Sequence, residues 1–246
     1  MQCNKFWMAA LLFGMMAVGS ASAATCTLAS MNGIYGFITS GYDGSYGAGN
    51  VGQSTTNGKG DISGTFTHSV AGKVNTYTFS GTYTMEKNCT GTLDYTVSGE
   101  AVHFNFTMDD SSKGLQLTRT DTGYINVGYA IPLGTATCGL SGKTSTFALN
   151  LFGGVSGTGN VGYGGQFILN GKGAITGSMT LNLDGTVTSG VAITGTYTQS
   201  SNCTGTIQVT PSGRAAQNYA TVAVNGNKEL LLLETDSGSV VFGTLQ

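Results

Sequence analysis

Charged residues, histidine and tryptophan are scarce in this chain. Only 9% of its 246 residues are Asp, Glu, Lys or Arg, and it has two histidines and one tryptophan. No run of basic residues occurs anywhere in the sequence. Proteins that bind nucleic acid or anionic membrane surfaces usually carry such runs. The composition therefore argues against nucleic acid as a partner and leaves few side chains for acid–base catalysis.

Proline is also rare, whereas glycine is abundant: the chain has 2 Pro and 40 Gly. Abundant glycine together with serine and threonine is typical of flexible linkers. Here, however, Val, Ile, Leu, Tyr and Phe recur at alternate positions between the glycines, which is the pattern of strands joined by tight turns. We expect an all-β fold, because no stretch after the N-terminal segment has the period of a helix.

The N-terminus has the features of a secretory signal peptide. Lys5 supplies a positive start, residues 8–18 are apolar, and the small-x-small sequence ending at Ala23 suits signal peptidase. The apolar run is too short to cross a bilayer, since a helix of that length rises only about 17 Å. We predict that residues 1–23 are removed and that the mature protein, with a net charge of −3, is exported to the periplasm, the cell surface or the medium.

The second half of the chain repeats the first. Six short motifs recur in the same order at offsets of 110 to 115 residues, and most are turn or cysteine sequences. We expect two copies of one domain, over 24–131 and 132–246, with a linker over 129–137. The motifs and their second copies are Cys26 and Cys138, Asn50-Val51-Gly52 and Asn160-Val161-Gly162, Asn57-Gly58-Lys59-Gly60 and Asn170-Gly171-Lys172-Gly173, Gly81-Thr82-Tyr83-Thr84 and Gly195-Thr196-Tyr197-Thr198, Asn88-Cys89-Thr90-Gly91-Thr92 and Asn202-Cys203-Thr204-Gly205-Thr206, and Thr120-Asp121 and Thr235-Asp236.

Each copy is expected to contain eight strands. Asn-Gly and Asp-Gly pairs between them tolerate the positive φ that two-residue hairpin turns require. Short connections indicate antiparallel neighbours. The expected strands are 33–41, 48–56, 60–69, 74–84, 91–98, 101–108, 113–121 and 124–130 in the first copy, and 144–152, 159–169, 173–183, 188–198, 204–210, 219–224, 228–236 and 239–245 in the second.

The strands alternate between an apolar and a polar face. Val102, Phe104, Phe106 and Met108, for example, alternate with polar residues. This pattern indicates an antiparallel sheet with one buried face, and closure into a barrel removes its exposed edges. We predict two tandem antiparallel eight-stranded β-barrels, with a β-sandwich as the runner-up. A single outer-membrane barrel fits less well, because several strands are short and the outward positions are rich in threonine.

Cysteine usage supports export. Cys3 leaves with the signal peptide, and the four remaining cysteines fall as two in each copy. Disulfides form in the oxidising compartments that exported chains enter. Of the three pairings that four cysteines allow, the repeat favours Cys26–Cys89 and Cys138–Cys203, because each domain then closes on itself. No CxxC motif is present and no histidine has ligand spacing, so we expect neither a metal nor a cofactor.

One charged residue near the end of the seventh strand of each copy is a candidate for ligand binding. Arg119 shares the parity of Leu115 and Leu117, and Glu234 shares that of the corresponding leucines in the second copy. At a barrel mouth such a charge can orient the polar end of a ligand, or it can extend past the rim into water.

His68 and two tyrosines are the other candidates. His68 shares the parity of Phe66, which directs it toward the barrel interior, and its counterpart in the second copy is Leu181. Tyr42 and Tyr46 lie in an expected loop, where aromatic side chains either contact a partner or cover the barrel end. Neither a Gly-x-Ser-x-Gly elbow nor a phosphate-binding loop occurs, and we assign no catalytic residue.

The repeated motifs also resemble a known group of domains. Residues 81–92, followed by Thr-Asp-Thr-Gly at 120–123, are similar to secreted bacterial β-domains that resemble the barrel of allene oxide cyclases and dirigent proteins. The run recurs over 195–206 and 235–238. This resemblance implies a calycin-like eight-stranded barrel with an apolar cavity. No catalytic residue of the plant enzymes matches a position here, so none is carried over.

These observations favour an exported, non-enzymatic tandem-barrel protein that acts as a binding or extracellular-surface module for a small apolar ligand. The first alternative is a cyclase-like or isomerase-like enzyme in the first barrel, which holds both histidines of the mature chain. The second is a protein that contacts carbohydrate or adheres to surfaces through Tyr42 and Tyr46. The enzyme hypothesis requires His68 or Arg119 to face an open cavity with a second polar group within reach.

Overall fold

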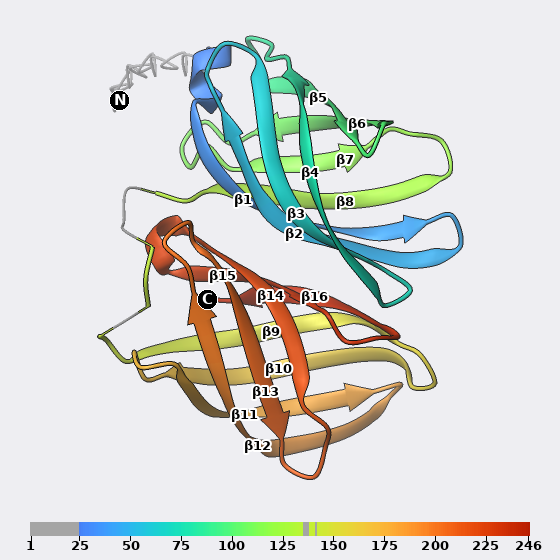
Figure 1. The fold of residues 1–246 in the computed structure, drawn as a ribbon, viewed down its shortest axis with the longest axis vertical. Coiled ribbons are helices and arrows are strands. Elements are labelled where there is room, and N and C mark those ends of the chain that lie inside the picture. The colour runs from blue at the N-terminus through green and yellow to red at the C-terminus, as the bar shows by residue number, and fades with distance from the viewer. Residues whose placement is uncertain (1–24, 135–137, 141) are drawn as a thin grey trace, which may run out of the picture.

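The structure is a computed structural model that describes residues 25–134, 138–140 and 142–246. These residues form two closed eight-stranded antiparallel barrels in tandem (Figure 1). Barrel 1 contains β1–β8 and barrel 2 contains β9–β16. Within each barrel, successive strands pair and the first strand also pairs with the last. The predicted all-β fold of two tandem barrels is confirmed, while the predicted signal peptide lies outside the described residues.

The observed strands follow the predicted ones closely, and their ends differ by no more than three residues. One difference concerns the linker, since residues 129–132 complete β8 and pair with β1. Two short 3-10 helices, η1 (Leu28–Met31) and η2 (Asn225–Asn227), also occur. The strands are β1 (Gly33–Asp43), β2 (Tyr46–Thr56), β3 (Asp61–Val70), β4 (Lys73–Tyr83), β5 (Thr90–Val97), β6 (Glu100–Met108), β7 (Leu115–Arg119), β8 (Tyr124–Pro132), β9 (Ser145–Val155), β10 (Gly159–Leu169), β11 (Ala174–Leu183), β12 (Thr186–Gln199), β13 (Thr204–Pro211), β14 (Gln217–Val224), β15 (Glu229–Glu234) and β16 (Ser239–Leu245).

The recurring motifs make the same contacts in both barrels. In each Asn-Gly-Lys-Gly turn, the asparagine Oδ1 accepts backbone N–H groups from the residues two and four positions later. The tyrosine of each Gly-Thr-Tyr-Thr motif ties down the segment before the first strand: Tyr83 Oη donates to the Leu28 carbonyl at 2.9 Å, and Tyr197 Oη donates to the Leu140 carbonyl at 3.3 Å. These motifs therefore recur because they build the scaffold.

Both predicted disulfides are present. Cys26 is bonded to Cys89 and Cys138 to Cys203, with Cα atoms 5.0 and 4.8 Å apart. Cys89 and Cys203 both adopt left-handed backbone conformations, with φ of 66° and 70°. Each bridge stays within its own half of the chain, as the repeat predicts. Among the helices of the described ranges, none has both the length and the hydropathy needed to cross a membrane.

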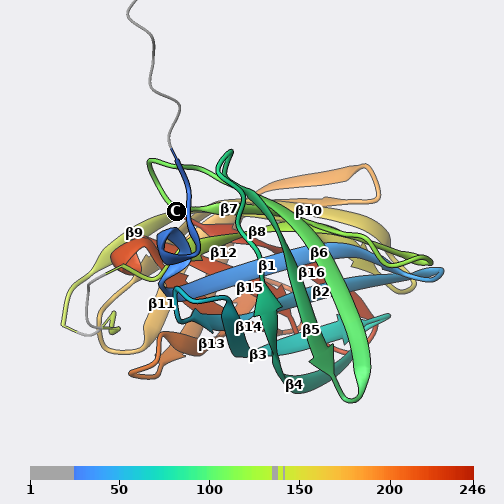
Figure 2. The ribbon, with the colours of Figure 1, turned by 90° about the horizontal axis from the view of Figure 1, so that it is seen from above.

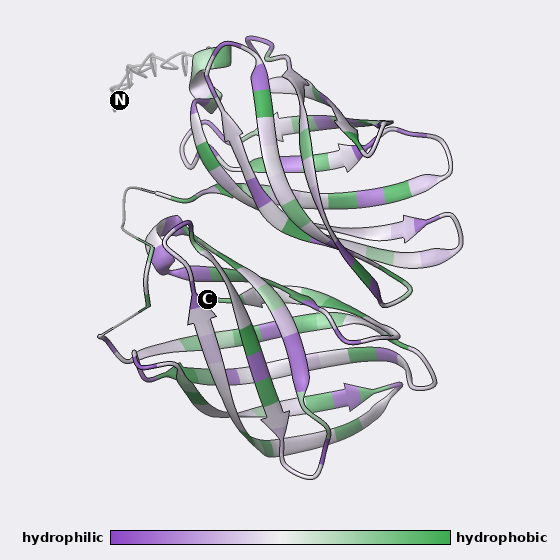
Figure 3. Cartoon of the chain, viewed as in Figure 1, coloured by the Kyte–Doolittle hydropathy of each residue, from purple (hydrophilic) through white to green (hydrophobic). Residues whose placement is uncertain are grey.

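Inward and outward residues alternate along the strands, which Figure 3 shows as alternating hydropathy along the ribbons. In β6, the predicted inward residues Val102, Phe104, Phe106 and Met108 are buried, and the residues between them are exposed. The buried face of the sheet is thus the inside of the barrel, as expected for a closed antiparallel sheet with one solvated side.

The wall between the barrels departs from the prediction of a single buried face. Every residue of β15 is buried, because one face lines barrel 2 and the other packs on β1 and β2 of barrel 1 (Figures 1 and 2). A Cβ added at Gly49 of β2 would lie 2.8 Å from Leu233 Cδ1. Ile38 and Val51 of barrel 1 belong to the same buried cluster as Leu231 of barrel 2. The two barrels therefore share an apolar interface.

Candidate ligand-binding site

Barrel 1 holds a cavity of about 320 Å³, a size within the usual range of small-molecule pockets. One end is closed by Met31 of η1, which is 1% exposed and lines the cavity. Neighbouring aromatic rings along the walls lie with centroids 4.7 to 6.2 Å apart. The aromatic wall consists of Phe37, Phe66, Tyr77, Phe79, Tyr95 and Phe104.

Polar side chains gather at the other end of the cavity, where β1, β3 and β7 end and β2 and β8 begin. His68 Nδ1 lies 2.6 Å from Asn50 Oδ1, and Asn50 Nδ2 donates to Thr39 Oγ1 at 2.9 Å. Since the Asn50 oxygen accepts, His68 Nδ1 carries the proton and Nε2 presents a lone pair. Nε2 lies 3.8 Å from Asp43 Oδ2, which is beyond hydrogen-bond length.

The environment of His68 favours its neutral form. Burial lowers the pKa of the imidazole, and this outweighs the opposing effect of Asp43. The positive charge of Arg119 lowers the pKa further. His68 is therefore an uncharged hydrogen-bonding group at neutral pH, with its acceptor nitrogen among the cavity residues.

Arg119 occupies the same end of the cavity from β7. Its Nε donates to Asp121 Oδ2 at 2.7 Å, and its Cζ lies 3.6 Å from the centroid of the Tyr124 ring. The terminal guanidinium nitrogens have no hydrogen-bond partner among the residues that the structure describes. Arg119 thus has N–H donors available at the cavity mouth, while one carboxylate already balances its charge.

Asp121 fixes this corner of the barrel. Besides the Arg119 contact, it accepts hydrogen bonds from His103 N at 3.1 Å and from His103 Nδ1 at 2.6 Å. Burial acts to raise the pKa of Asp121, but the hydrogen bonds from His103 and Arg119 outweigh it and lower the pKa. Asp236 holds Asn218 in the same way in barrel 2, through the backbone N–H and side-chain amide at 2.7 Å each. The recurring aspartate therefore has a structural role, since in both barrels it accepts hydrogen bonds from the neighbouring strand.

Two buried oxygen atoms at the mouth lack a partner. Asp43 Oδ1 and Asn126 Oδ1 are fully buried but have no hydrogen bond within the described part of the chain. Both residues line the cavity, and Asn126 is only 4% exposed. Buried polar atoms nearly always form hydrogen bonds in native proteins. Two cavity oxygens without one therefore indicate a place for a hydrogen-bond donor.

Barrel 2 provides an internal comparison, because the strand registers match residue by residue. Tyr163 faces Leu151 in barrel 2 as Asn50 faces Thr39 in barrel 1. The Asn-Val-Gly sequences at 50–52 and 160–162 are therefore not equivalent in space, which corrects the sequence alignment. Across the mouth and walls, barrel 2 replaces small or polar residues with larger or apolar ones. The pairs are Thr39 and Leu151, Asp43 and Val155, Asn50 and Tyr163, Ser54 and Phe167, His68 and Leu181, Asn126 and Val241, and Ala130 and Leu245.

The substitutions place large, buried side chains inside the second barrel. Leu151, Phe167, Leu181 and Leu245 are each no more than 2% exposed. The same fold therefore forms with Val155, Val241 and Leu181 at the positions where barrel 1 carries Asp43, Asn126 and His68. Because the scaffold does not require these polar residues, they mark barrel 1 as the candidate site.

The structure separates the residues that the sequence proposed for ligand binding. His68 and Arg119 line one cavity. Glu234 occupies the position of Arg119 in barrel 2, where it is 3% exposed and its Oε2 has no hydrogen-bond partner in the described ranges. Tyr42 and Tyr46 are 53% and 63% exposed and do not line the cavity. They belong to β1 and β2, which a two-residue turn joins, so the expected loop is a tight hairpin.

Sequence reasoning missed Asp43, Asn126 and Tyr124. Asp43 shares the parity of Tyr35 and Phe37, and this was the available signal. All three lie at or near strand ends beside turns, where an acidic or amide residue is common for local reasons. For Asn126 and Tyr124, the strand register with β1 shows that they share the inner face with Asp43.

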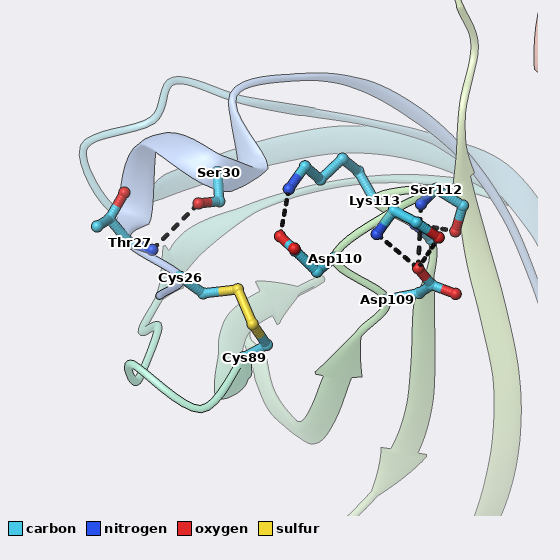
Figure 4. A network of polar contacts seen from close by, with 10 residues as sticks. Cys26, Thr27, Ser30, Cys89, Asp109, Asp110, Ser112 and Lys113 are labelled. Carbon is cyan, nitrogen blue, oxygen red and sulfur yellow. Dashed lines mark hydrogen bonds and ion pairs between the residues drawn. A yellow bond between two sulfur atoms is a disulfide. The ribbon is translucent and has the colours of Figure 1, made fainter. Parts of the chain in front are cut away.

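The described residues include one grouping of three potential metal ligands, Cys26, Cys89 and Asp110. Both sulfurs are joined in the disulfide, as Figure 4 shows, so neither offers a thiolate. Asp110 pairs instead with Lys113, whose Nζ lies 2.8 Å from Asp110 Oδ1. This corner closes the barrel and is not a metal site.

Comparisons with known proteins leave the family open. No family model matches the chain, and no curated protein matches it. Among solved structures, the chain is similar to the isotype 1 transferrin binding protein B from serogroup B Neisseria meningitidis, with a TM-score of 0.38 and 8% identity. The match covers 81% of this chain and 64% of that one. At this level of similarity, the function of the site has to be inferred from its own geometry.

Proposed function

We propose that this protein is an exported binding protein whose first barrel holds a small, largely apolar molecule. The observation that carries the proposal is the contrast between the barrels: the first copy encloses a cavity with a polar mouth, and the second carries larger or apolar, buried side chains at the corresponding positions. The two disulfides support an extracytoplasmic site of action, since such bonds persist in oxidising compartments. The resemblance to allene oxide cyclase and dirigent barrels is compatible with such a cavity, and membership of that family stays a prediction.

The aromatic wall supplies the main driving force for binding. A molecule that buries about 250 Å² of apolar surface gains about 6 kcal/mol at 25 cal/mol per Å². Association costs several kcal/mol in lost freedom, so apolar contact alone gives weak binding. The polar groups at the mouth then decide affinity and orientation.

Filling the cavity with residues taken from barrel 2 is expected to abolish binding. The double variant Ser54→Phe, Ala130→Leu places in barrel 1 the side chains found at Phe167 and Leu245. We expect the neutral apolar dye N-phenyl-1-naphthylamine to bind the native protein with enhanced fluorescence. The filled variant should bind it at least about tenfold more weakly, because the aromatic wall is no longer accessible.

A matched control lies on the same strand. Val127→Leu adds a methylene group on the outside of β8, where the residue is 50% exposed, and should leave dye affinity unchanged. Circular dichroism and intact disulfides verify that the filled variant has folded. Equal dye binding by the native and filled proteins contradicts the proposal.

A second candidate function is proton transfer in the same cavity, which the free Nε2 of His68 favours. A bound carbonyl compound could lose a proton from the adjacent carbon to this nitrogen, while the Arg119 N–H groups stabilise the resulting enolate oxygen. In a β,γ-unsaturated carbonyl compound, return of the proton from His68 to the γ-carbon shifts the double bond to the α,β position and completes an isomerisation without any further reactant.

Deuterium exchange tests this candidate directly. For 4-phenyl-2-butanone in D₂O, we expect the native protein to accelerate exchange at the carbons beside the carbonyl, as measured by NMR. His68→Gln should lower that rate by about 10²-fold or more while dye affinity is retained. Exchange no faster than in buffer rules out proton transfer on this ketone and leaves the binding function intact.

A further inference from the structure

We infer that barrel 1 selects ligands that carry a protonated amine on an apolar body, with Asp43 and Asn126 as the recognition pair. This inference rests on the proposed binding function and specifies the class of ligand. Asp43 Oδ1 and Asn126 Oδ1 are buried oxygens of cavity-lining residues and have no partner among the residues that the structure describes, and an alkylammonium group offers three N–H donors.

The charges around the cavity favour a cation. The charged residues that line it are Asp43, Glu100 and Arg119. Arg119 is already paired with Asp121 at 2.7 Å, so its charge is balanced within the protein. Among the described residues, Asp43 has no charged partner at hydrogen-bond distance, since His68 Nε2 lies 3.8 Å away. The lining therefore retains an excess of negative charge.

His68 does not compensate the Asp43 carboxylate. Its Nε2 lies 3.8 Å from Asp43 Oδ2, and its other nitrogen is held by Asn50 at 2.6 Å. A histidine in this position, with its only proton directed toward Asn50, offers Asp43 no hydrogen bond. The carboxylate therefore lies at the mouth partly exposed, and its buried Oδ1 has no partner among the described residues.

Asp43 and Asn126 lie on the same wall. β1 pairs with β8, and Gly41 faces Asn126 while Asp43 faces Tyr124. The two residues are therefore diagonal neighbours on the inner face, within reach of groups on one ligand. The aromatic rings of Phe66 and Tyr77 lie beside His68, at 6.2 and 5.9 Å between centroids, and ring faces attract cations as well as apolar groups.

Barrel 2 lacks both members of the pair. Val155 stands at the position of Asp43 and Val241 at that of Asn126. Barrel 2 therefore lacks both oxygen acceptors and carries apolar side chains in their place. This links the pair to the cavity and supplies a substitution that the fold already accepts.

A series of compounds with one body and three head groups tests the inference. We would measure displacement of N-phenyl-1-naphthylamine by 4-phenylbutylamine, 4-phenylbutan-1-ol and 4-phenylbutanoate at neutral pH. For the native protein we expect the amine to bind about tenfold or more tightly than the alcohol, and the carboxylate to bind most weakly. Charge-assisted hydrogen bonds to Asp43 produce this order.

Variants locate the origin of the preference. Asp43→Asn should reduce the advantage of the amine over the alcohol to about twofold or less, and Asn126→Val should weaken amine binding about threefold to tenfold. Asp94→Asn removes the same charge from the outward face of β5 and should leave the order unchanged. Circular dichroism and urea denaturation verify that each variant is folded. The surface variant Asp94→Asn should bind the dye as the native protein does.

The outcomes separate the two proposals. If the dye binds but all three compounds bind equally, or the carboxylate binds most tightly, the amine preference is wrong and the binding function stands. The same conclusion follows if Asp94→Asn abolishes the preference as fully as Asp43→Asn does. If the dye does not bind the native protein, the proposed function itself fails.

Discussion

Replacing Cys26 and Cys89 together with alanine is expected to lower the free energy of unfolding by about 4 kcal/mol. The bridge spans 63 residues, and in the chain-entropy model a cross-link over a loop of this length restricts the unfolded chain by that amount. Urea denaturation of native and variant proteins measures the difference.

The same variant should also weaken dye binding. Cys26 holds the segment that leads into η1, where Met31 closes the end of the cavity opposite the polar mouth. After the bridge is removed, the Tyr83 hydrogen bond to Leu28 and a backbone hydrogen bond from Cys26 to Lys87 are the remaining polar ties that position this segment against β4 and the turn after it. We expect a loss of affinity of about threefold to tenfold, because the cavity floor is less well ordered.

The second disulfide is the matched control. Cys138–Cys203 closes a loop of 65 residues in barrel 2, and neither cysteine is among the described residues that line the cavity. Its removal should destabilise the protein by a similar amount and leave dye affinity unchanged. A loss of less than about 1 kcal/mol in both variants would show that neither bridge stabilises the fold as proposed.

The fold was predictable because local signals agree with one another. Turn pairs, alternating apolar residues and the repeat each indicate the same strand boundaries. Register was less accessible, because a recurring Asn-Val-Gly sequence suggested equivalence between positions 50 and 160 that the strand pairing does not support. When two alignments of the repeats are supported by equally short sequence matches, only the hydrogen bonds between strands determine which residues are equivalent.

The candidate site was predictable in part. Parity placed Arg119 and His68 inside a barrel, but it could not say whether that barrel was open or filled. That property depends on the summed volume of side chains from all strands, including Ser54 and Ala130, which carry no chemical signal of their own. The double burial of β15 was also missed, since a continuous apolar run such as Leu230 to Leu233 reads the same in a barrel core and at an interface.

Glu234 is expected to make the stability of barrel 2 depend on pH. Burial raises the pKa of this carboxyl from 4.5 to about 7, and the nearby Asp236 contributes to the increase against an opposing hydrogen bond from Ser239. Glu234 is 3% exposed, and its Oε2 has no partner within the described residues. It faces Tyr219, whose hydroxyl group is also buried and unpaired.

The sign of the effect follows from linkage. Because the folded state binds the Glu234 proton more tightly than the unfolded state, this contribution to stability is fully present below about pH 4.5 and is lost as the pH rises to about 7. A difference of about 2.5 pKa units corresponds to about 3 kcal/mol. Glu234→Gln removes the titration, so the native protein should lose about 3 kcal/mol relative to the variant between about pH 4 and pH 8.

Urea denaturation of the native protein and Glu234→Gln across this pH range measures the free energy of unfolding of each. Subtracting one from the other removes the contribution of every group that titrates alike in both proteins. Asp184→Asn, in the exposed turn between β11 and β12, is a control that should give a curve parallel to the native one. Parallel curves for Glu234→Gln and the native protein would contradict a buried, proton-binding carboxyl. The expected divergence would mean that barrel 2 keeps an ionisable side chain at the position of Arg119 at a cost in stability near neutral pH. Arg119 is paired with Asp121, whereas Glu234 is buried beside the like charge of Asp236.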